Sequence, residues 1–191
     1  MIALFVPQIF GVNSMQVNNK MNEEMKHYKH KMTPRNEDFL DNAPMRATDS
    51  IVINASTSEV WNTLDNTQGF VQWFPGVVWA KMEIESEKGN GAKRLAKLNS
   101  YEYYEEMIAV KQNESWGITM LESTTGLFES ITEVVYLEEI DSNTTTVIFR
   151  GGYQPKGFGK LLKRMMTKST IKIWRNALLG LKEYVEQPHK D

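Results

Sequence analysis

Residues 158–184, FGKLLKRMMTKSTIKIWRNALLGLKEY, form the longest stretch of this chain that can be a single helix. Its apolar side chains recur at steps of three, four and seven residues, which places them on one face of a helix. The members of this stripe are Phe158, Leu162, Met166, Ile173, Ala177, Leu181 and Tyr184. Pro155 and two glycines mark the beginning of the stretch, and Pro188 prevents its continuation. We therefore predict a long amphipathic helix near the C-terminus.

The segment before this helix is predicted to consist almost entirely of strands. Runs of alternating apolar and polar residues are separated by turn sequences at residues 89–91, 99–100 and 141–143. A first strand is expected at residues 47–55. Two short helices then follow, the first opened by a capping box of Ser56 and Glu59. The expected class is α+β, with a curved antiparallel sheet of about seven strands wrapped around the long helix.

The length of 191 residues favours one folded domain, which we place at residues 45–187. Residues 1–44 are interpreted as an N-terminal extension that is disordered or weakly helical, because most of it is polar with little periodicity. The apolar run at residues 2–10 is too short to span a bilayer. We expect a cytoplasmic protein.

The composition excludes several kinds of chemistry. The chain has no cysteine, so disulfides, thiolate nucleophiles and cysteine-ligated metals are ruled out. Its three histidines, His27, His30 and His189, all fall near the ends of the chain. A catalytic triad or a histidine-ligated metal inside the domain is therefore not expected, and neither is a cofactor.

The charges are distributed unevenly along the chain. Residues 45–141 hold 16 Asp and Glu against 7 Lys and Arg, whereas residues 142–182 hold 9 Lys and Arg and no acid. Either the basic helix pairs with an acidic sheet inside the fold, or it faces an anionic partner such as a lipid headgroup. A nucleic-acid partner is not expected, since no nucleic-acid-binding module is present.

The tight turn at Asn99-Ser100 sets a specific register between two predicted strands. If this turn has two residues, Leu98 lies opposite Tyr101, and Arg94 lies opposite Glu105. Cross-strand partners have Cβ atoms about 5 Å apart, which is close enough for an ion pair. Val78, Ala80, Met82 and Ile84 are predicted to share the face of Arg94. The pair is interpreted either as a structural salt bridge or as a polar anchor for a ligand.

Several short motifs, in this order and spacing, resemble the START/SRPBCC superfamily, within it the polyketide cyclase/dehydrase-like and birch-pollen-allergen-like proteins. They are residues 51–56 (IVINAS) with 59–61 (EVW), residues 73–77 (WFPGV), Gly91 with Arg94, Glu105 with Met107, residues 144–147 (TTTV) and residues 180–184 (GLKEY). The resemblance covers about residues 46–186 and implies the helix-grip fold, with a cavity between the sheet and the long helix.

Such cavities are mostly apolar with a few placed polar groups. The residues that we expect to line it are Trp73, Met82, Arg94, Tyr103, Glu105, Met107, Trp116, Ile118, Met120, Phe149, Tyr153, Met166, Ser169 and Ile173. The resemblance implies binding of a hydrophobic or amphipathic small molecule, such as a lipid or a polyketide-like compound. No metal is expected, because the domain lacks cysteine and inner histidine ligands.

Three functions stay open at this point. Binding, or transport, of the hydrophobic molecule without catalysis is preferred. An enzyme of the cyclase, aromatase or dehydratase kind is the first alternative, with Glu105 as proton acceptor and Arg94 beside it lowering the pKa of that carboxyl. The second alternative is a module that uses the basic C-terminal helix for weak contact with an anionic membrane, or for contact with another protein.

Overall fold

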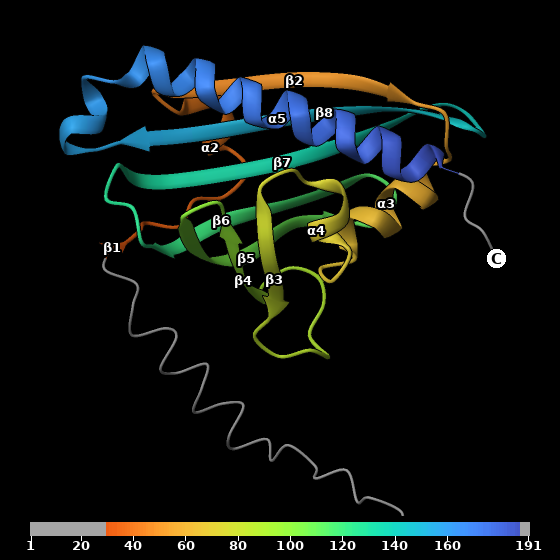
Figure 1. Ribbon diagram of the computed structural model, residues 1–191, viewed down its shortest axis with the longest axis horizontal. Coiled ribbons are helices and arrows are strands. Elements are labelled where there is room, and N and C mark those ends of the chain that lie inside the picture. The colour runs from red at the N-terminus through yellow and green to blue at the C-terminus, as the bar shows by residue number, and fades with distance from the viewer. Residues whose placement is uncertain (1–29, 188–191) are drawn as a thin grey trace, which may run out of the picture.

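The computed structural model describes residues 30–187 as one curved antiparallel sheet covered on its inner side by a long helix (Figure 1). The strand order is β2-β8-β7-β6-β5-β4-β3, and β1 pairs separately with β6. The strands are β1 His30–Lys31, β2 Met45–Ile53, β3 Val77–Met82, β4 Lys93–Leu98, β5 Tyr101–Lys111, β6 Ser115–Ser123, β7 Phe128–Asp141 and β8 Thr144–Pro155. The predicted α+β class and helix-grip architecture are confirmed.

The helices are α2 Phe39–Asn42, α3 Thr57–Asp65, α4 Phe70–Trp73, the short 3₁₀ helix η1 Gly157–Lys160 and α5 Lys163–Glu186. The predicted capping box begins α3: the Ser56 hydroxyl accepts from the Glu59 backbone N–H, and the Glu59 carboxylate accepts from the Ser56 backbone N–H. No helix among residues 30–187 combines the length and hydrophobicity that a membrane-spanning helix requires.

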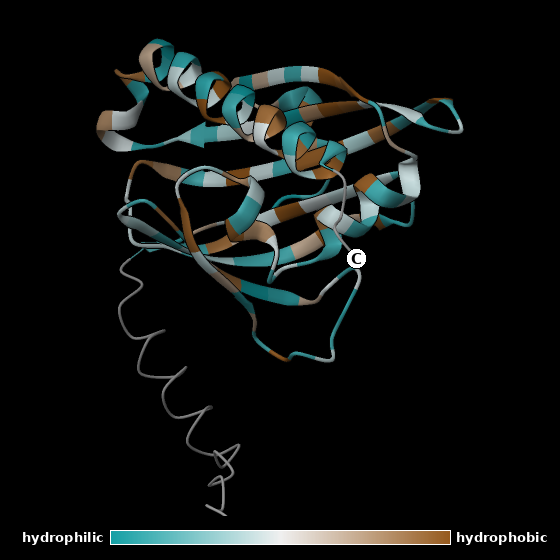
Figure 2. Cartoon of the chain, turned by 45° about the vertical axis from the view of Figure 1, so that its right-hand side comes forward, coloured by the Kyte–Doolittle hydropathy of each residue, from teal (hydrophilic) through white to brown (hydrophobic). Residues whose placement is uncertain are grey.

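The long helix begins five residues later than predicted. Gly157 has φ +51°, a left-handed conformation, and residues 157–160 form η1 rather than the first turn of α5. Phe158, expected on the buried stripe, is therefore 67% exposed. Hydrophilic and hydrophobic residues alternate along α5, as in an amphipathic helix (Figure 2).

Helix α5 is held against the sheet and α4 by close backbone contact and by polar bonds. A Cβ atom at Gly180 would lie 2.1 Å from the Trp73 backbone oxygen, so only glycine permits this approach. Along the edge strand β2, Lys182 donates to the Val52 backbone oxygen at 2.8 Å. The Glu186 carboxylate accepts from the Asn54 backbone N–H at 2.6 Å. These three contacts all involve residues in the C-terminal half of α5, and none of them involves its N-terminal half.

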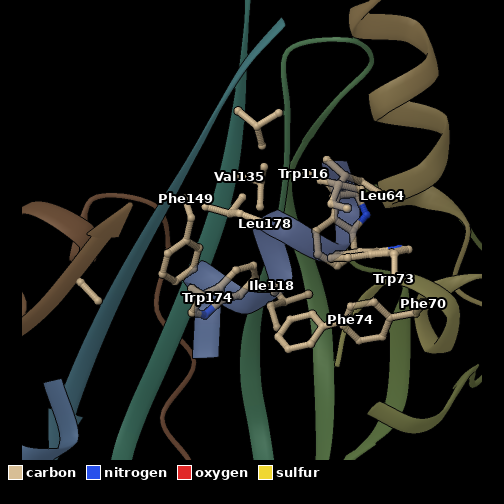
Figure 3. Close-up of a cluster of buried hydrophobic side chains, with 14 of the residues drawn as sticks. Leu64, Phe70, Trp73, Phe74, Trp116, Ile118, Val135, Phe149, Trp174 and Leu178 are labelled. Carbon is tan, nitrogen blue, oxygen red and sulfur yellow. The ribbon is translucent and has the colours of Figure 1, made fainter. Parts of the chain in front are cut away.

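A cluster of aromatic side chains fills the space between α4, α5 and the sheet (Figure 3). The ring of Trp174 from α5 stacks on Phe149 of β8 with centroids 3.7 Å apart, and Phe74 meets Trp174 edge-on at 5.2 Å. Phe70 and Trp73 of α4 complete the cluster, with centroids 5.1 Å apart. This packing defines one wall of the space under the helix.

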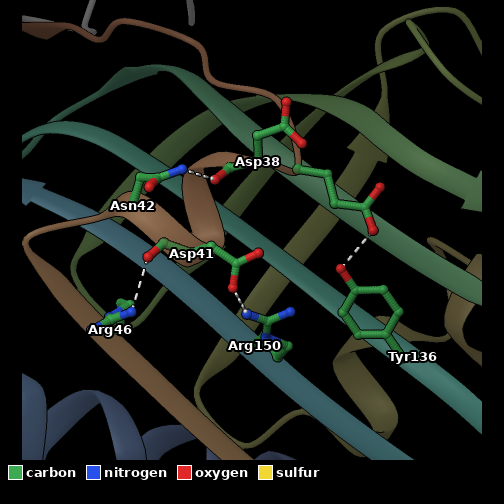
Figure 4. A network of polar contacts seen from close by, with 7 residues as sticks. Asp38, Asp41, Asn42, Arg46, Tyr136 and Arg150 are labelled. Atoms are coloured by element: carbon green, nitrogen blue, oxygen red, sulfur yellow. Dashed lines mark hydrogen bonds and ion pairs between the residues drawn. The ribbon is translucent and has the colours of Figure 1, made fainter.

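Residues 30–44 are part of the packed structure, unlike the extension expected from sequence; residues 1–29 lie outside the described residues. Arg150 of the sheet donates to Asp41 at 2.6 Å, and the Tyr136 hydroxyl donates to Glu37 at 2.6 Å (Figure 4). Met32 and Leu40 of this segment are buried. The prediction failed because a few apolar side chains of this segment are buried and two of its acidic side chains pair with residues on the outer face of the sheet.

Strand β3 departs from the predicted alternation. Ala80 pairs with Ala96 and Met82 with Arg94, which places both side chains on the predicted face, but a register shift lies between Val77 and Trp79. Val78 is consequently 56% exposed, and Val77 takes the inward position. Ile84 lies beyond the end of the strand and is exposed.

Candidate functional site

A cavity of about 250 Å³ lies between the inner face of the sheet and α5. Ten of the residues predicted to line it do so: Arg94, Tyr103, Glu105, Trp116, Ile118, Met120, Tyr153, Met166, Ser169 and Ile173. They come from β4, β5, β6, β8 and α5, so the strands supply the floor and the helix supplies the cover. This volume of about 250 Å³ is slightly below the range typical of small-molecule sites, about 300–1,000 Å³.

Four predicted residues do not line this cavity. Trp73 is buried in the aromatic cluster under α5, and Phe149 is covered by the stacked ring of Trp174. Met82 and Met107 line a separate, more polar pocket instead. For these four residues the sequence predicted which face of the strand or helix they occupy. It did not predict which other elements would cover that face and separate them from the cavity.

Arg94 and Glu105 face each other across β4 and β5, in the register that the Asn99-Ser100 turn predicted. Nε of Arg94 donates to Oε2 of Glu105 at 2.7 Å, and both side chains are almost fully buried. Burial raises the pKa of the Glu105 carboxyl above its ordinary value, and Arg94 opposes that rise. The net direction is opposite to the sequence-based expectation, because desolvation outweighs the neighbouring cation.

The guanidinium of Arg94 is held between two aromatic rings. It lies 4.5 Å from the ring centroid of Phe70 and 4.9 Å from that of Trp116. Its Nη1 atom is buried and has no hydrogen-bond partner among the described residues. Buried donors normally have a partner, so this atom is a ready donor for an oxygen of a bound molecule.

Glu133 on β7 is a second carboxylate in the cavity, and sequence reasoning missed it. Its Oε1 accepts from the Tyr153 hydroxyl at 2.6 Å and from Nε1 of Trp174 at 3.2 Å. Burial raises the pKa of Glu133 to about 7, although both hydrogen bonds act to lower it. Burial and the nearby Glu133 carboxylate likewise raise the pKa of Tyr153, which keeps its hydroxyl protonated as the donor.

The hydroxyl of Tyr153 reaches Glu133 because the residue between them has no side chain. Gly151 is the cross-strand partner of Glu133, whereas Tyr153 pairs with Ile131 two residues away. A Cβ atom at Gly151 would lie 2.3 Å from the Tyr153 hydroxyl oxygen. The glycine therefore leaves the space into which the tyrosine folds back.

A signal for Glu133 was present in the sequence. Ile131, Val135 and Leu137 are buried on the same face of β7, and Glu133 is the charged residue in that inward series. An acid at an otherwise apolar inward position indicates a buried polar site. Trp174 carried a weaker signal, because it lies beside the predicted helical stripe rather than on it.

The cavity opens between the β4–β5 turn and α5. Asn99 and Tyr101 at the turn and Ser169 on the helix line the cavity and are also exposed. Its ionisable groups are thus one guanidinium, two carboxyls and three tyrosines, arranged among apolar walls. This set can bind an oxygen function and exchange a proton at neutral pH. Among residues 30–187 no group of three potential metal ligands occurs.

The sequence of the folded part is similar to that of a known family. Residues 44–186 match the family model described as polyketide cyclase/dehydrase and lipid transport. No curated protein matches the chain.

Solved structures share the fold at low identity. The Zhui aromatase/cyclase from Streptomyces sp. R1128 superposes with a TM-score of 0.65 at 11% identity, covering 74% of this chain and 93% of that one. The di-domain ARO/CYC protein BexL from the BE-7585A biosynthetic pathway gives 0.63 at 16% identity, covering 74% of this chain and 46% of that one. A START superfamily protein from Mycobacterium smegmatis gives 0.61 at 12% identity, covering 73% and 98%.

Proposed function

Because the chain belongs to the polyketide cyclase/dehydrase and lipid transport family, we propose that it binds a hydrophobic or amphipathic small molecule in the cavity between the sheet and α5. The observation that carries this proposal is the orphaned Nη1 of Arg94, a buried donor at an apolar cavity. A ligand with an apolar body and an oxygen acceptor would satisfy this atom. Lipids and polyketide-like compounds have both features.

The polar groups of the cavity restrict further which ligands would fit. Arg94 offers a donor, while Glu133 accepts two hydrogen bonds at one oxygen and has a second oxygen without a protein partner in the contacts described. A carbonyl or carboxylate near Arg94 and a hydroxyl near Glu133 would therefore both be matched. The volume of about 250 Å³ suits a compact ring system or a short acyl chain better than a two-chain lipid.

The test measures a ligand in the full-length protein. Native mass spectrometry would detect a co-purified molecule, and calorimetry would measure binding of 2-naphthoic acid as a probe with an apolar ring and a carboxylate. Ser169→Trp, at the exposed mouth, is expected to weaken probe binding about tenfold or more by filling the entrance. Asn176→Trp, exposed on the same helix and away from the cavity, is the matched control. Equal affinity in both variants would refute the cavity as the binding site.

A second candidate is an enzyme of the cyclase, aromatase or dehydratase kind, favoured by Glu133. A carboxyl with a pKa near 7 can take a proton from a carbon next to a carbonyl at neutral pH, and Arg94 can stabilise the resulting enolate oxygen. Tyr153 would keep Glu133 oriented during the transfer. In this mechanism Glu105 orients Arg94. The proton acceptor is Glu133, and not Glu105 as the sequence suggested.

Two substitutions separate the candidates. The assay incubates the protein with a linear poly-β-ketone acid and follows ring closure by mass spectrometry of the products. For an enzyme, Glu133→Gln abolishes turnover but preserves binding, and Glu105→Gln impairs both because Arg94 loses its partner. Turnover that survives Glu133→Gln, or that wild type lacks, removes the catalytic candidate and leaves the binding protein.

A further inference from the structure

The junction between β8 and α5 exposes three large apolar side chains. Phe158, Leu161 and Met165 are 67%, 79% and 61% exposed. Phe158 lies in η1, Leu161 in the link after it and Met165 in the first turn of α5, where the chain projects past the end of β8 (Figure 1). Exposed apolar residues gathered in one place indicate an interaction surface.

The same junction is densely basic. Lys160, Lys163, Arg164 and Lys168 are all exposed around the three apolar side chains. We call these seven residues the α5 tip. No acid occurs anywhere in residues 142–182, so nothing on the tip itself neutralises these cations.

The sequence left open whether the basic helix pairs with the acidic sheet, and for the tip the structure decides against it. Among residues 30–187, Arg175 pairs with Asp49 and Lys182 with Glu186, both toward the C-terminal end of α5. The four cations of the tip make no ion pair within the described part of the chain. They remain available to an external anion.

The position of these cations on α5 is unfavourable for the isolated protein. Lys163 and Arg164 occupy the first turn of a 24-residue helix, whose N-terminal N–H groups carry partial positive charge. No acidic residue lies in that turn, and the N-cap residue Leu162 offers no side-chain cap. Phosphate oxygens would be attracted by both the cations and the helix end.

We propose that the α5 tip docks on the surface of a bilayer that contains anionic phospholipids. Phe158, Leu161 and Met165 enter the boundary between headgroups and acyl chains, and the four cations contact the lipid phosphates and acidic headgroups. Charge complementarity selects this partner: an apolar patch on another protein would match the three side chains but not the surrounding cations.

Docking at this place would bring the cavity close to the membrane. The backbone N–H of Lys156 donates to the Leu127 oxygen at 2.9 Å, which ties the turn before η1 to a residue that lines the cavity. Met166 lines the cavity from the inner side of α5, while its neighbour Met165 is exposed on the tip. The first turns of α5 thus face the cavity on one side and present the docking surface on the other.

The test is flotation of the full-length protein with vesicles of phosphatidylcholine alone and of phosphatidylcholine mixed with phosphatidylserine. Wild type is expected to float with the mixed vesicles only, and to be released by high salt. Leu161→Ser and the charge reversal Lys163→Glu with Arg164→Glu are each expected to reduce binding by about tenfold or more. All these positions are exposed, so circular dichroism should show unchanged folding.

A control variant reverses two positive charges outside the α5 tip, so that its net charge equals that of the Lys163→Glu, Arg164→Glu variant. Lys88→Glu with Lys111→Glu, both exposed in turns and at strand ends away from α5, is expected to leave flotation near wild type. Equal loss in this control, binding to phosphatidylcholine alone, or no flotation at all would overturn the proposal. So would a dimer in sedimentation that Leu161→Ser dissolves, since a second copy would then be the occupant of the tip. Each result is independent of ligand binding in the cavity.

Discussion

The Tyr153 hydroxyl lies 2.6 Å from Oε1 of Glu133, across neighbouring strands and over the bare backbone of Gly151. Trp174 reaches the same oxygen from α5 at 3.2 Å. One carboxyl therefore joins two strands and the covering helix, and its protonation state affects both the site and the packing of the helix.

Replacing Tyr153 by Phe should raise the pKa of Glu133 above about 7. The hydroxyl stabilises the charged carboxylate, so its removal favours the neutral form. Carbon NMR of labelled glutamate carboxyls, assigned with Glu133→Gln, would measure the titration. Gly151→Ala should shift it in the same direction by displacing the hydroxyl, whereas Tyr136→Phe, which only frees Glu37 on the other face, should not. A lower or unchanged pKa in Tyr153→Phe would contradict the assignment.

Stability should depend on the charge of Glu133 in a direction opposite to that of most carboxyls. Its pKa is about 7 in the folded state against 4.5 for the free group, so the folded protein binds the extra proton between these values. Stability is therefore full below about pH 4.5 with respect to this group and falls as the pH rises toward 7. Glu133→Gln should remove that fall.

Urea denaturation of both proteins at pH 5 and pH 8 would measure this difference. The shift sets an upper limit of about 3 kcal/mol for the relative gain of Glu133→Gln at pH 8, and partial hydration of the cavity makes the actual gain smaller. Glu105 titrates in both proteins, so its effect cancels in the comparison. Parallel stability changes in the two proteins would show that folding does not raise the pKa of Glu133.

The part of the site that could be predicted is the part in which a short turn fixes the register of two neighbouring strands. A two-residue turn fixes which residues face each other, so Arg94 and Glu105 could be paired from sequence alone. Alternation along β6 likewise placed Ile118 and Met120 inward, because the register shift in this strand falls after Met120 and leaves the period of two before it unchanged.

What failed depends on packing between distant elements or on a single irregular residue. The register shift near Val78 reversed one predicted face, and the positive φ of Gly157 moved the start of α5. The bond from Trp174 to Glu133 needs the rotation of α5 over the sheet, which periodicity within α5 does not determine. Hence the ion pair was predicted and the second carboxyl site was not.

Replacing Arg94 by Leu should destabilise the protein by about 3–5 kcal/mol, because Glu105 is left buried without its cation. The double variant Arg94→Leu with Glu105→Leu should recover most of this loss, since no buried charge remains unpaired. Chemical denaturation of wild type, both single variants and the double variant gives the coupling between the residues. Additive losses would show that the two side chains act independently.

Arg94→Lys should fold but bind 2-naphthoic acid more weakly, because it lacks the Nη1 donor.

Gly180→Ala tests whether the approach of α5 to α4 is as close as described. Alanine is favoured over glycine inside a helix by about 1 kcal/mol, so a Gly180 that packed against nothing would make this substitution stabilising. A Cβ atom here would instead lie 2.1 Å from the Trp73 backbone oxygen, and backbone cannot yield as a flexible side chain can. We expect a net loss of about 1–3 kcal/mol, as for overpacked cores. Asn176→Ala, on the exposed side of the same helix, should be neutral or slightly stabilising in the same urea titration. A gain in stability for Gly180→Ala would mean that α5 lies farther from α4, and the cavity beneath it would then be wider than 250 Å³.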